Sequence, residues 1–168
     1  MKRWMLPAVL ALSASFSGCS ATGPAFKPES AARAGEATLY VYRPKTHALS
    51  ALSAVIEVDG VRYAAIGNNG YVAIPVRAGT HAVTQTWKGS VLTNSDLQGK
   101  PIVTSITTSE GIASYVRLES YAASTRNVEV SGNLNIHADL AWRLREVDAA
   151  TALPEIASCR QARLGANQ

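Results

Sequence analysis

Cysteine and histidine are scarce in this sequence, and their spacing argues against the commonest metal and redox motifs. The chain contains two cysteines, Cys19 and Cys159, and three histidines, His47, His81 and His137. It has no Cys-x-x-Cys pair and no His-Glu-x-x-His motif. Such spacings hold zinc or carry out thiol–disulfide exchange. We therefore predict no bound metal and no cofactor.

Runs of basic residues are also missing, which argues against nucleic acid as a partner. The chain has 16 Lys and Arg against 12 Asp and Glu. Two of the basic residues, Lys2 and Arg3, belong to an N-terminal leader. The rest of the chain therefore has 14 basic and 12 acidic residues. Nucleic-acid binding requires basic side chains concentrated on one face or in one run. We expect the scattered arginines to be solvated surface residues. They include Arg43, Arg77, Arg117, Arg143 and Arg145.

Catalytic motifs are absent as well. Neither a Gly-x-Ser-x-Gly elbow nor a Gly-x-x-x-x-Gly-Lys-Ser phosphate loop occurs. The carboxylates Glu57, Asp59, Glu119 and Asp139 fall at predicted turns or strand surfaces. His137 and Asp139 project from one side of a predicted strand, where solvent exposure is the simpler interpretation and a metal-dependent enzyme the competing one. We predict a protein that is not an enzyme, with no catalytic and no metal-binding residues.

No apolar run is long enough to span a membrane permanently, but the N-terminus has the form of an export signal. Met1-Lys2-Arg3 is positively charged, and residues 4–16 are mostly apolar. As a helix these residues rise about 20 Å, against a hydrocarbon core of about 30 Å. Residues 1–18 are therefore predicted to be a signal peptide that is removed on export.

The residues that follow the apolar stretch, Phe16-Ser17-Gly18-Cys19, resemble the lipobox of bacterial lipoproteins. The resemblance implies that the Cys19 thiol receives a diacylglycerol, that cleavage follows Gly18, and that the new amino group is acylated. Phe16 departs from the leucine usual at its position. Cleavage by the ordinary signal peptidase after Ala21, which would give a secreted periplasmic protein, is the alternative. Two or three acyl chains would anchor the protein stably to a membrane.

The position after Cys19 bears on which membrane is used. Ser20 stands where aspartate would resemble an inner-membrane retention signal, so we expect the outer membrane, with the domain facing the periplasm. Residues 19–36 are rich in small and polar types, with Phe26 the only large apolar residue, and are predicted to be a lipidated N-terminus and flexible tether. A lipidated Cys19 leaves Cys159 as a buried free thiol or as half of an intermolecular disulfide.

Residues 37–147 have the pattern of short β-strands separated by turns. Residues 37–44 are apolar, β-branched and aromatic and end in proline. Asp59-Gly60 joins residues 53–58 to 61–66, the strongest short hairpin signal. The turn at residues 67–70 predicts a second hairpin, from 61–66 to 71–76. Further strands are expected at 80–87, 102–107, 112–118 and 134–144, the last with alternating apolar residues from Leu134 to Leu144.

The C-terminus is predicted to be helical. Asp148 is a suitable N-cap for a helix over residues 149–163, interrupted or restarted at Pro154, with Leu153, Ile156 and Cys159 on one side. The whole pattern predicts a mainly β fold: a single antiparallel β-sandwich or partly closed barrel at 37–147, with a short helix in a C-terminal tail at 148–168.

Three segments resemble an uncharacterised family of small bacterial lipoproteins. They are a strand ending in Arg43-Pro44, the Val58-Asp59-Gly60 hairpin, and residues 74–83, in which a proline–glycine turn precedes histidine; residues 153–156 add a late match. The middle part is similar to the PEGA-type surface domain, an immunoglobulin-like β unit. The likeness covers residues 37–160 and implies fold and location, with no activity to transfer.

These observations favour a non-enzymatic envelope protein that presents loops or a sheet edge to another envelope protein. The alternative is a periplasmic module that binds a glycan or a lipid headgroup and uses aromatic side chains as stacking surfaces. The aromatic candidates are Trp87, Tyr115 and Tyr121.

Overall fold

In the computed structural model of this chain, the described residues are 21–28, 33–88, 100–130 and 133–164, with 125–130 and 133–139 described by their backbone alone. They form nine strands and one short helix. The elements are β1 (Glu36–Arg43), β2 (Ser53–Val58), β3 (Val61–Ile66), β4 (Gly70–Arg77), β5 (Gly79–Lys88), β6 (Ile102–Thr108), β7 (Ala113–Val130), β8 (Asn133–Val147), α1 (Ala149–Ile156) and β9 (Arg160–Gln161).

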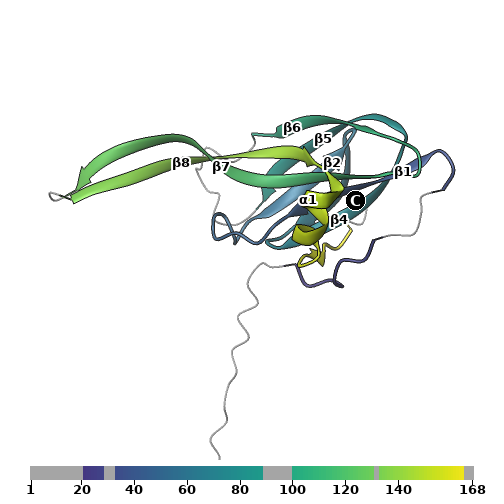
Figure 1. The fold of residues 1–168 in the computed structure, drawn as a ribbon, viewed down its shortest axis with the longest axis horizontal. Coiled ribbons are helices and arrows are strands. Elements are labelled where there is room, and N and C mark those ends of the chain that lie inside the picture. The colour runs from purple at the N-terminus through teal and green to yellow at the C-terminus, as the bar shows by residue number, and fades with distance from the viewer. Residues whose placement is uncertain (1–20, 29–32, 89–99, 131–132, 165–168) are drawn as a thin grey trace, which may run out of the picture.

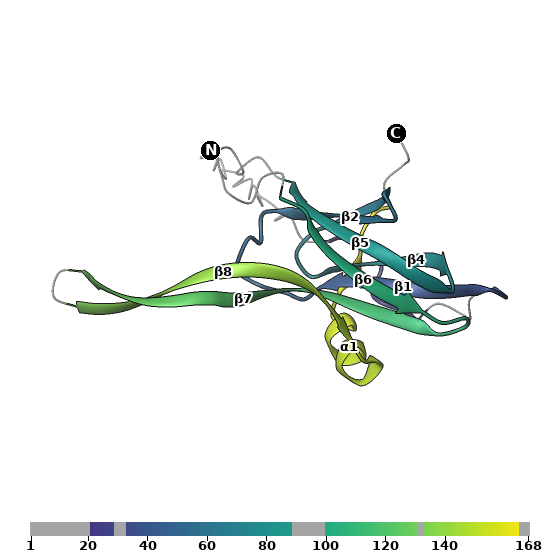
Figure 2. The same cartoon turned by 90° about the horizontal axis from the view of Figure 1, so that it is seen from above.

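The strands form two sheets that lie face to face (Figure 1, Figure 2). One sheet has the strand order β8-β7-β1-β4-β9, and the other has the order β3-β2-β5-β6. The predicted mainly β fold, a sandwich with a short C-terminal helix, is thereby confirmed, and the described strands do not close into a barrel.

Two strand pairs are parallel in a sandwich whose other pairs are antiparallel. β1 pairs with β7 from Thr38↔Ala113 to Tyr42↔Arg117, and β4 pairs with the two residues of β9. A parallel pair requires a long connection, and between β1 and β7 the chain passes through the opposite sheet. The prediction of a wholly antiparallel sandwich was therefore wrong for these two pairs. The alternation of apolar residues along one strand does not reveal the direction of the strand beside it.

The first predicted hairpin is present and the second is wrong. β2 and β3 are joined at Asp59-Gly60, where both residues have positive φ, as a tight hairpin turn requires. β4, however, pairs with β1 in the other sheet, so the turn after β3 carries the chain across the sandwich. Asn69 in this turn has a φ of 56°.

β1 is buried on both faces. Its Leu39 and Val41 face the opposite sheet and join the main core between the two layers. Its Tyr40 and Tyr42 point to the outer face, where α1 covers them and a second core forms (Figure 2). The strand thus has the continuous apolar character of an element covered on both sides.

α1 is shorter than the sequence predicted. Asp148 is its N-cap, as expected, and accepts a hydrogen bond from the N–H of Thr151 at 2.8 Å. The helix ends at Ile156 because the chain then extends to form β9 beside β4. Ile156 and Cys159 are buried in the second core, but Leu153 is exposed, contrary to the predicted shared face.

Residues 21–28 pack on the domain, although the sequence predicted a flexible tether as far as residue 36. The ring of Phe26 meets those of Tyr40 and Tyr71 edge-on, with centroid distances of 5.4 and 5.3 Å. Aromatic pairs in this geometry stabilise beyond the area they bury. The predicted tether therefore contributes a side chain to the second core.

Candidate functional site

A two-stranded ribbon extends away from the sandwich (Figure 1, Figure 2). It consists of residues 121–130 of β7 paired with residues 133–141 of β8. In the described part of the chain, no other strand pairs with either edge of this ribbon. The sequence predicted a strand ending at Leu118, so all of the first ribbon strand was missed.

The side chains described at the root of the ribbon are exposed. Leu140 is 52% exposed and Tyr121 is 40% exposed, because none of the described strands forms a second layer over this part of the sheet. The expectation that Leu140 would lie on a half-buried face was therefore wrong. A two-stranded hairpin is marginally stable in water by itself, and its open edges are templates for pairing with another chain.

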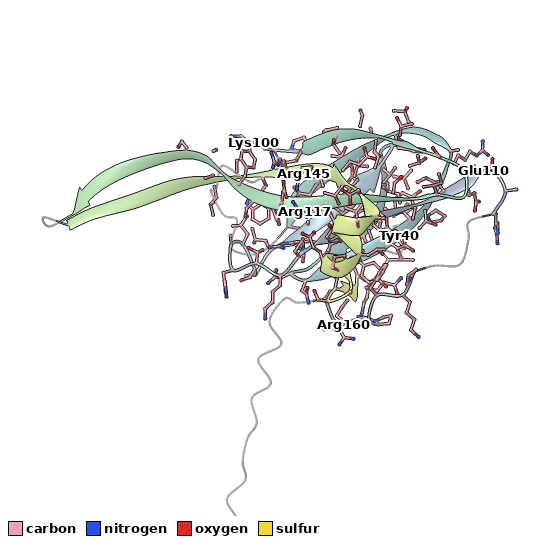
Figure 3. All side chains as sticks on the ribbon, in the orientation of Figure 1. Tyr40, Lys100, Glu110, Arg117, Arg145 and Arg160 are labelled. Carbon is pink, nitrogen blue, oxygen red and sulfur yellow. The ribbon has the colours of Figure 1, made fainter. Side chains whose placement is uncertain are left out.

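A network of charges lies around Glu119, close to the residues where the ribbon begins. Figure 3 labels two of its members, Arg117 and Arg145. Glu119 forms ion pairs with Arg117 on its own strand and with Arg143 and Arg145 on β8. The Nε of Arg143 donates to Oε1 of Glu119 at 2.7 Å, and the Nε of Arg145 lies 3.0 Å from the same oxygen. The sequence analysis expected these three arginines to be separate solvated charges, but all three form ion pairs with one carboxylate.

Two opposing effects act on the pKa of Glu119, namely burial and the neighbouring arginines. Burial raises it, but hydrogen bonds from Arg143 and Arg117 and the positive charges of Arg117 and Arg145 outweigh the burial. The net effect is a pKa below the usual value for glutamate. Glu119 therefore stays ionised at neutral pH and has the character of an anchor for the arginines rather than of a proton donor.

Arg117 connects this network to α1. Its Nη1 donates to Oε1 of Glu155 at 2.6 Å, and the hydroxyl of Tyr42 donates to Oε2 of the same carboxylate at 2.6 Å. Desolvation and this hydrogen bond raise the pKa of Tyr42. The helix is thereby fixed to the strands from which the ribbon extends.

A pocket of about 260 Å³ lies beside the network. Its lining includes Arg117, Glu119, Glu155, Lys45 and Trp142. The Nε of Arg117 is buried without a hydrogen-bond partner. The pocket thus offers polar contacts to a small ligand, while both of its carboxylates are already held by arginine.

Arg43 is fully buried between the sheets, contrary to the expected solvated position. Its guanidinium lies over the rings of Trp87 and Trp142, 5.0 and 5.5 Å from the ring centroids. It donates to the carbonyl oxygens of Leu52 at 2.7 Å and Leu49 at 2.8 Å. Burial lowers the pKa of Arg43 to about 10. No pattern in the sequence distinguished it from the exposed arginines.

Two of the three aromatic residues predicted as stacking surfaces are core residues. Trp87 packs edge-on against Trp142 with ring centroids 4.8 Å apart, and Tyr115 stacks on Tyr40 at 5.3 Å. Tyr121 is the exposed one, and the guanidinium of Arg143 covers its ring at 4.9 Å. Only Tyr121 remains available to stack on a ligand.

The side chains of the histidines and cysteines are described only in part. The side chains of His137 and Asp139 lie outside the described residues, as does Cys19. In the described part, no group of three or more His, Cys, Asp and Glu side chains is placed to hold a metal ion. Cys159 is a buried free thiol, and burial raises its pKa to about 11.

His81 bonds to the backbone of its own turn and to the Asp59 turn. Its Nε2 lies 2.7 Å from the carbonyl oxygen of Arg77, and its Nδ1 lies 2.7 Å from Oδ2 of Asp59. Both partners are acceptors, so the arrangement favours the imidazolium, in which both nitrogens donate. The hydrogen bond to Asp59 raises the pKa of His81, and the same bond lowers the pKa of Asp59.

A pH-dependent contribution to stability follows from this pair. The raised pKa of His81 stabilises the fold fully below about pH 6.5, and the effect is lost as the pH rises through the folded-state value. The lowered pKa of Asp59 stabilises it above about pH 4, with loss as the pH falls through the folded-state value.

We expect the stability difference between the wild type and His81→Asn to be largest between about pH 4 and pH 6.5. It should shrink on either side of that window. Urea unfolding followed by circular dichroism across the pH range measures it. His47→Asn is the matched control, because no described side chain forms an ion pair with His47. A difference that does not vary with pH would contradict the assignment.

The proposed attachment to a membrane depends on residues at the N-terminus. No helix among the described residues has both the length and the apolar character needed to cross a bilayer. The predicted signal peptide and the lipidation residue Cys19 precede the first described residue, Ala21. Anchoring at Cys19 therefore stays a prediction from the sequence.

Comparisons with family models, with curated proteins and with solved structures found no match for this chain. The resemblance to small bacterial lipoproteins and to PEGA-type domains likewise stays a prediction.

Proposed function

We propose that this protein is a lipoprotein of the bacterial envelope, held on the outer membrane by acyl chains on Cys19, whose sandwich is a non-enzymatic module for binding another envelope protein. The ribbon is the observation that supports the interaction role. It extends away from the sandwich (Figure 1), and neither of its edges pairs with another strand among the described residues. The anchoring role is supported by the leader and by the Phe16-Ser17-Gly18-Cys19 segment.

The chemistry of the ribbon favours a protein partner that adds a strand. Along an unpaired edge, successive backbone N–H and C=O groups are free to bond to an extended segment, which gives affinity without a pocket. Added pairing would also stabilise a hairpin over which the described strands form no second layer. Leu140 and Tyr121, exposed at the root, would supply apolar contact area to the same partner.

The test is a variant with a shortened ribbon. Residues 123–139 are replaced by Asn-Gly, which joins the paired residues Ala122 and Leu140 through the preferred two-residue hairpin turn. A photo-reactive residue is placed at Tyr121, at the root, and at Ile112, which is exposed on a loop at the other end of β7. Cross-linking is carried out in growing cells of the host, and the products are identified by mass spectrometry.

We expect Tyr121 to cross-link to one envelope protein and Ile112 not to do so. Shortening the ribbon should abolish the product while leaving the urea unfolding midpoint close to that of the wild type. A product that survives shortening, or that forms equally from Ile112, would overturn the interaction role. An intact mass without acyl chains would overturn the anchor instead.

The alternative, a module that binds a glycan or a lipid headgroup, is supported by the pocket beside Arg117 and by the exposed ring of Tyr121. Peptidoglycan and lipopolysaccharide fragments should then shift the NMR resonances of residues around that pocket. Unchanged spectra across such a panel would remove this candidate.

A further inference from the structure

The first described residue lies directly on the domain surface. The N–H of Ala21 donates to the carbonyl oxygen of Asn68 at 3.3 Å, and its side chain lies beside Gly70. Only Ser20 separates Ala21 from Cys19. With consecutive Cα atoms 3.8 Å apart, the Cα of Cys19 lies within about 8 Å of the Cα of Ala21. Acyl chains on Cys19 would therefore begin within about 10 Å of the folded domain.

The end of the described chain lies on the same surface. Arg163 lines a pocket of about 290 Å³ together with Ala21 and Thr22. Arg163 and Leu164 also line a neighbouring pocket with Gly23. Among the residues lining these two pockets, none is acidic.

Arg160 adds a second exposed charge to this region. It forms an antiparallel bridge with Ala25, close to the first described residues, and its side chain projects from the underside of the domain in Figure 3. Leu164 is 60% exposed, among the most exposed of the large apolar residues described. Two basic side chains and one apolar side chain thus surround the point where the chain leaves for its anchor.

We propose that Arg160, Arg163 and Leu164, here named the C-terminal rim, bind the anionic phospholipid headgroups of the membrane that holds the acyl chains of Cys19. The inference rests on the proposed lipid anchor. It deepens that proposal because it places the domain against the bilayer, with one defined face down, instead of on a free tether.

The physical basis is the short distance to the anchor and the sign of the charge. Each Lys or Arg near an anionic membrane surface increases binding about fivefold. An exposed leucine beside such residues enters the interface between headgroups and acyl chains. Neither contribution would be large alone, but the anchor holds the rim at the bilayer surface, where its effective concentration is high.

The first experiment measures vesicle binding without acylation. The chain from residue 19, with Cys19→Ser, contains every described residue and is sedimented with vesicles of phosphatidylcholine alone or mixed with phosphatidylglycerol. The test variant is Arg160→Gln with Arg163→Gln. The matched control is Arg77→Gln with Lys100→Gln, which removes the same charge from exposed positions at the end of β4 and just before β6.

We expect binding to the anionic vesicles only, weakened by added salt. The rim variant should bind about 25-fold more weakly, which is fivefold for each of its two charges. The control variant should bind as the parent chain does. Equal binding by the rim variant, or equal binding to neutral vesicles, would overturn the proposal.

The second experiment reports orientation and keeps the anchor in place. A single environment-sensitive fluorophore is attached to Leu164→Cys or to Val103→Cys in the lipidated protein reconstituted into vesicles. Val103, on β6, is 59% exposed and thus matches Leu164. Cys159 is buried and will not compete for the label. A blue shift at residue 164 and none at 103 is expected, and equal spectra would contradict the assigned face.

The two proposals fail in different ways. Protein from the host that lacks acyl mass and stays in the membrane fraction after Cys19→Ala would overturn the anchor. The vesicle assay needs no acyl chain, so its failure bears on the rim alone. A protein that binds the rim would show itself as cross-links from Leu164 to a polypeptide together with no binding to anionic vesicles, and that outcome also overturns the lipid contact.

Discussion

Replacing Arg43 with alanine is expected to lower the free energy of unfolding by about 3–5 kcal/mol. The guanidinium donates to the carbonyl oxygens of Leu52 and Leu49 within 3 Å and to that of Ala48 at 3.2 Å. Alanine would leave these acceptors without that donor and open a cavity beside Trp87 and Trp142. Loss of an uncompensated buried charge offsets part of this cost.

A second substitution separates the contribution of the Arg43 hydrogen bonds from that of the volume its side chain fills. Arg43→Met fills much of the volume but donates no hydrogen bond, so we expect roughly half of the alanine effect. Arg62→Ala, at an exposed position on β3, should stay within about 0.5 kcal/mol of the wild type. Urea unfolding followed by circular dichroism gives all three values. An Arg43→Met protein as stable as the wild type would show that burying the charge costs as much as its hydrogen bonds contribute.

Replacing Glu119 with alanine is expected to cost about 2–3 kcal/mol, less than for a fully buried pair because the site keeps some solvent. The carboxylate is 15% exposed and contacts three arginines, which would be left facing one another. Added salt should reduce the loss, since it screens the repulsion among them. Glu146→Ala, exposed on the same strand β8 as two of these arginines, is the control and should change stability little.

The pH dependence of Glu119→Gln gives a second check. The lowered pKa of Glu119 means that its contribution is present above about pH 4.3 and is lost as the pH falls through the folded-state value. The stability difference between the wild type and Glu119→Gln should therefore vanish at low pH. A difference that persists in acid would show that the shape of the side chain, rather than its charge, holds the network.

Local signals in the sequence were sufficient for several elements of the fold. Asp59-Gly60 predicts its hairpin because only a few residue types tolerate positive φ at both central positions. Asp148 predicts the start of α1 because its carboxylate satisfies a free N–H of the first turn. In both cases the residues that decide the structure are neighbours along the chain.

Features that depend on distant contacts were not predictable in the same way. The predicted strand ended at Leu118, whereas β7 continues to Val130 through its pairing with β8. Arg43 resembled any surface arginine, since its acceptors belong to the loop at 44–52 and its ring contacts to β5 and β8. The charge network around Glu119 likewise joins β7, β8 and α1.

The pair of tryptophans at the root of the ribbon provides an internal optical reporter. Trp87 and Trp142 are the only tryptophans after residue 18, and they lie in contact beneath the guanidinium of Arg43. Trp142 belongs to β8, the strand that continues into the ribbon, and it also lines the pocket beside Arg117. In a chain that begins after residue 18, tryptophan emission therefore originates where the ribbon, the core and the pocket meet. Strand addition to the ribbon or entry of a ligand would then be followed without a label.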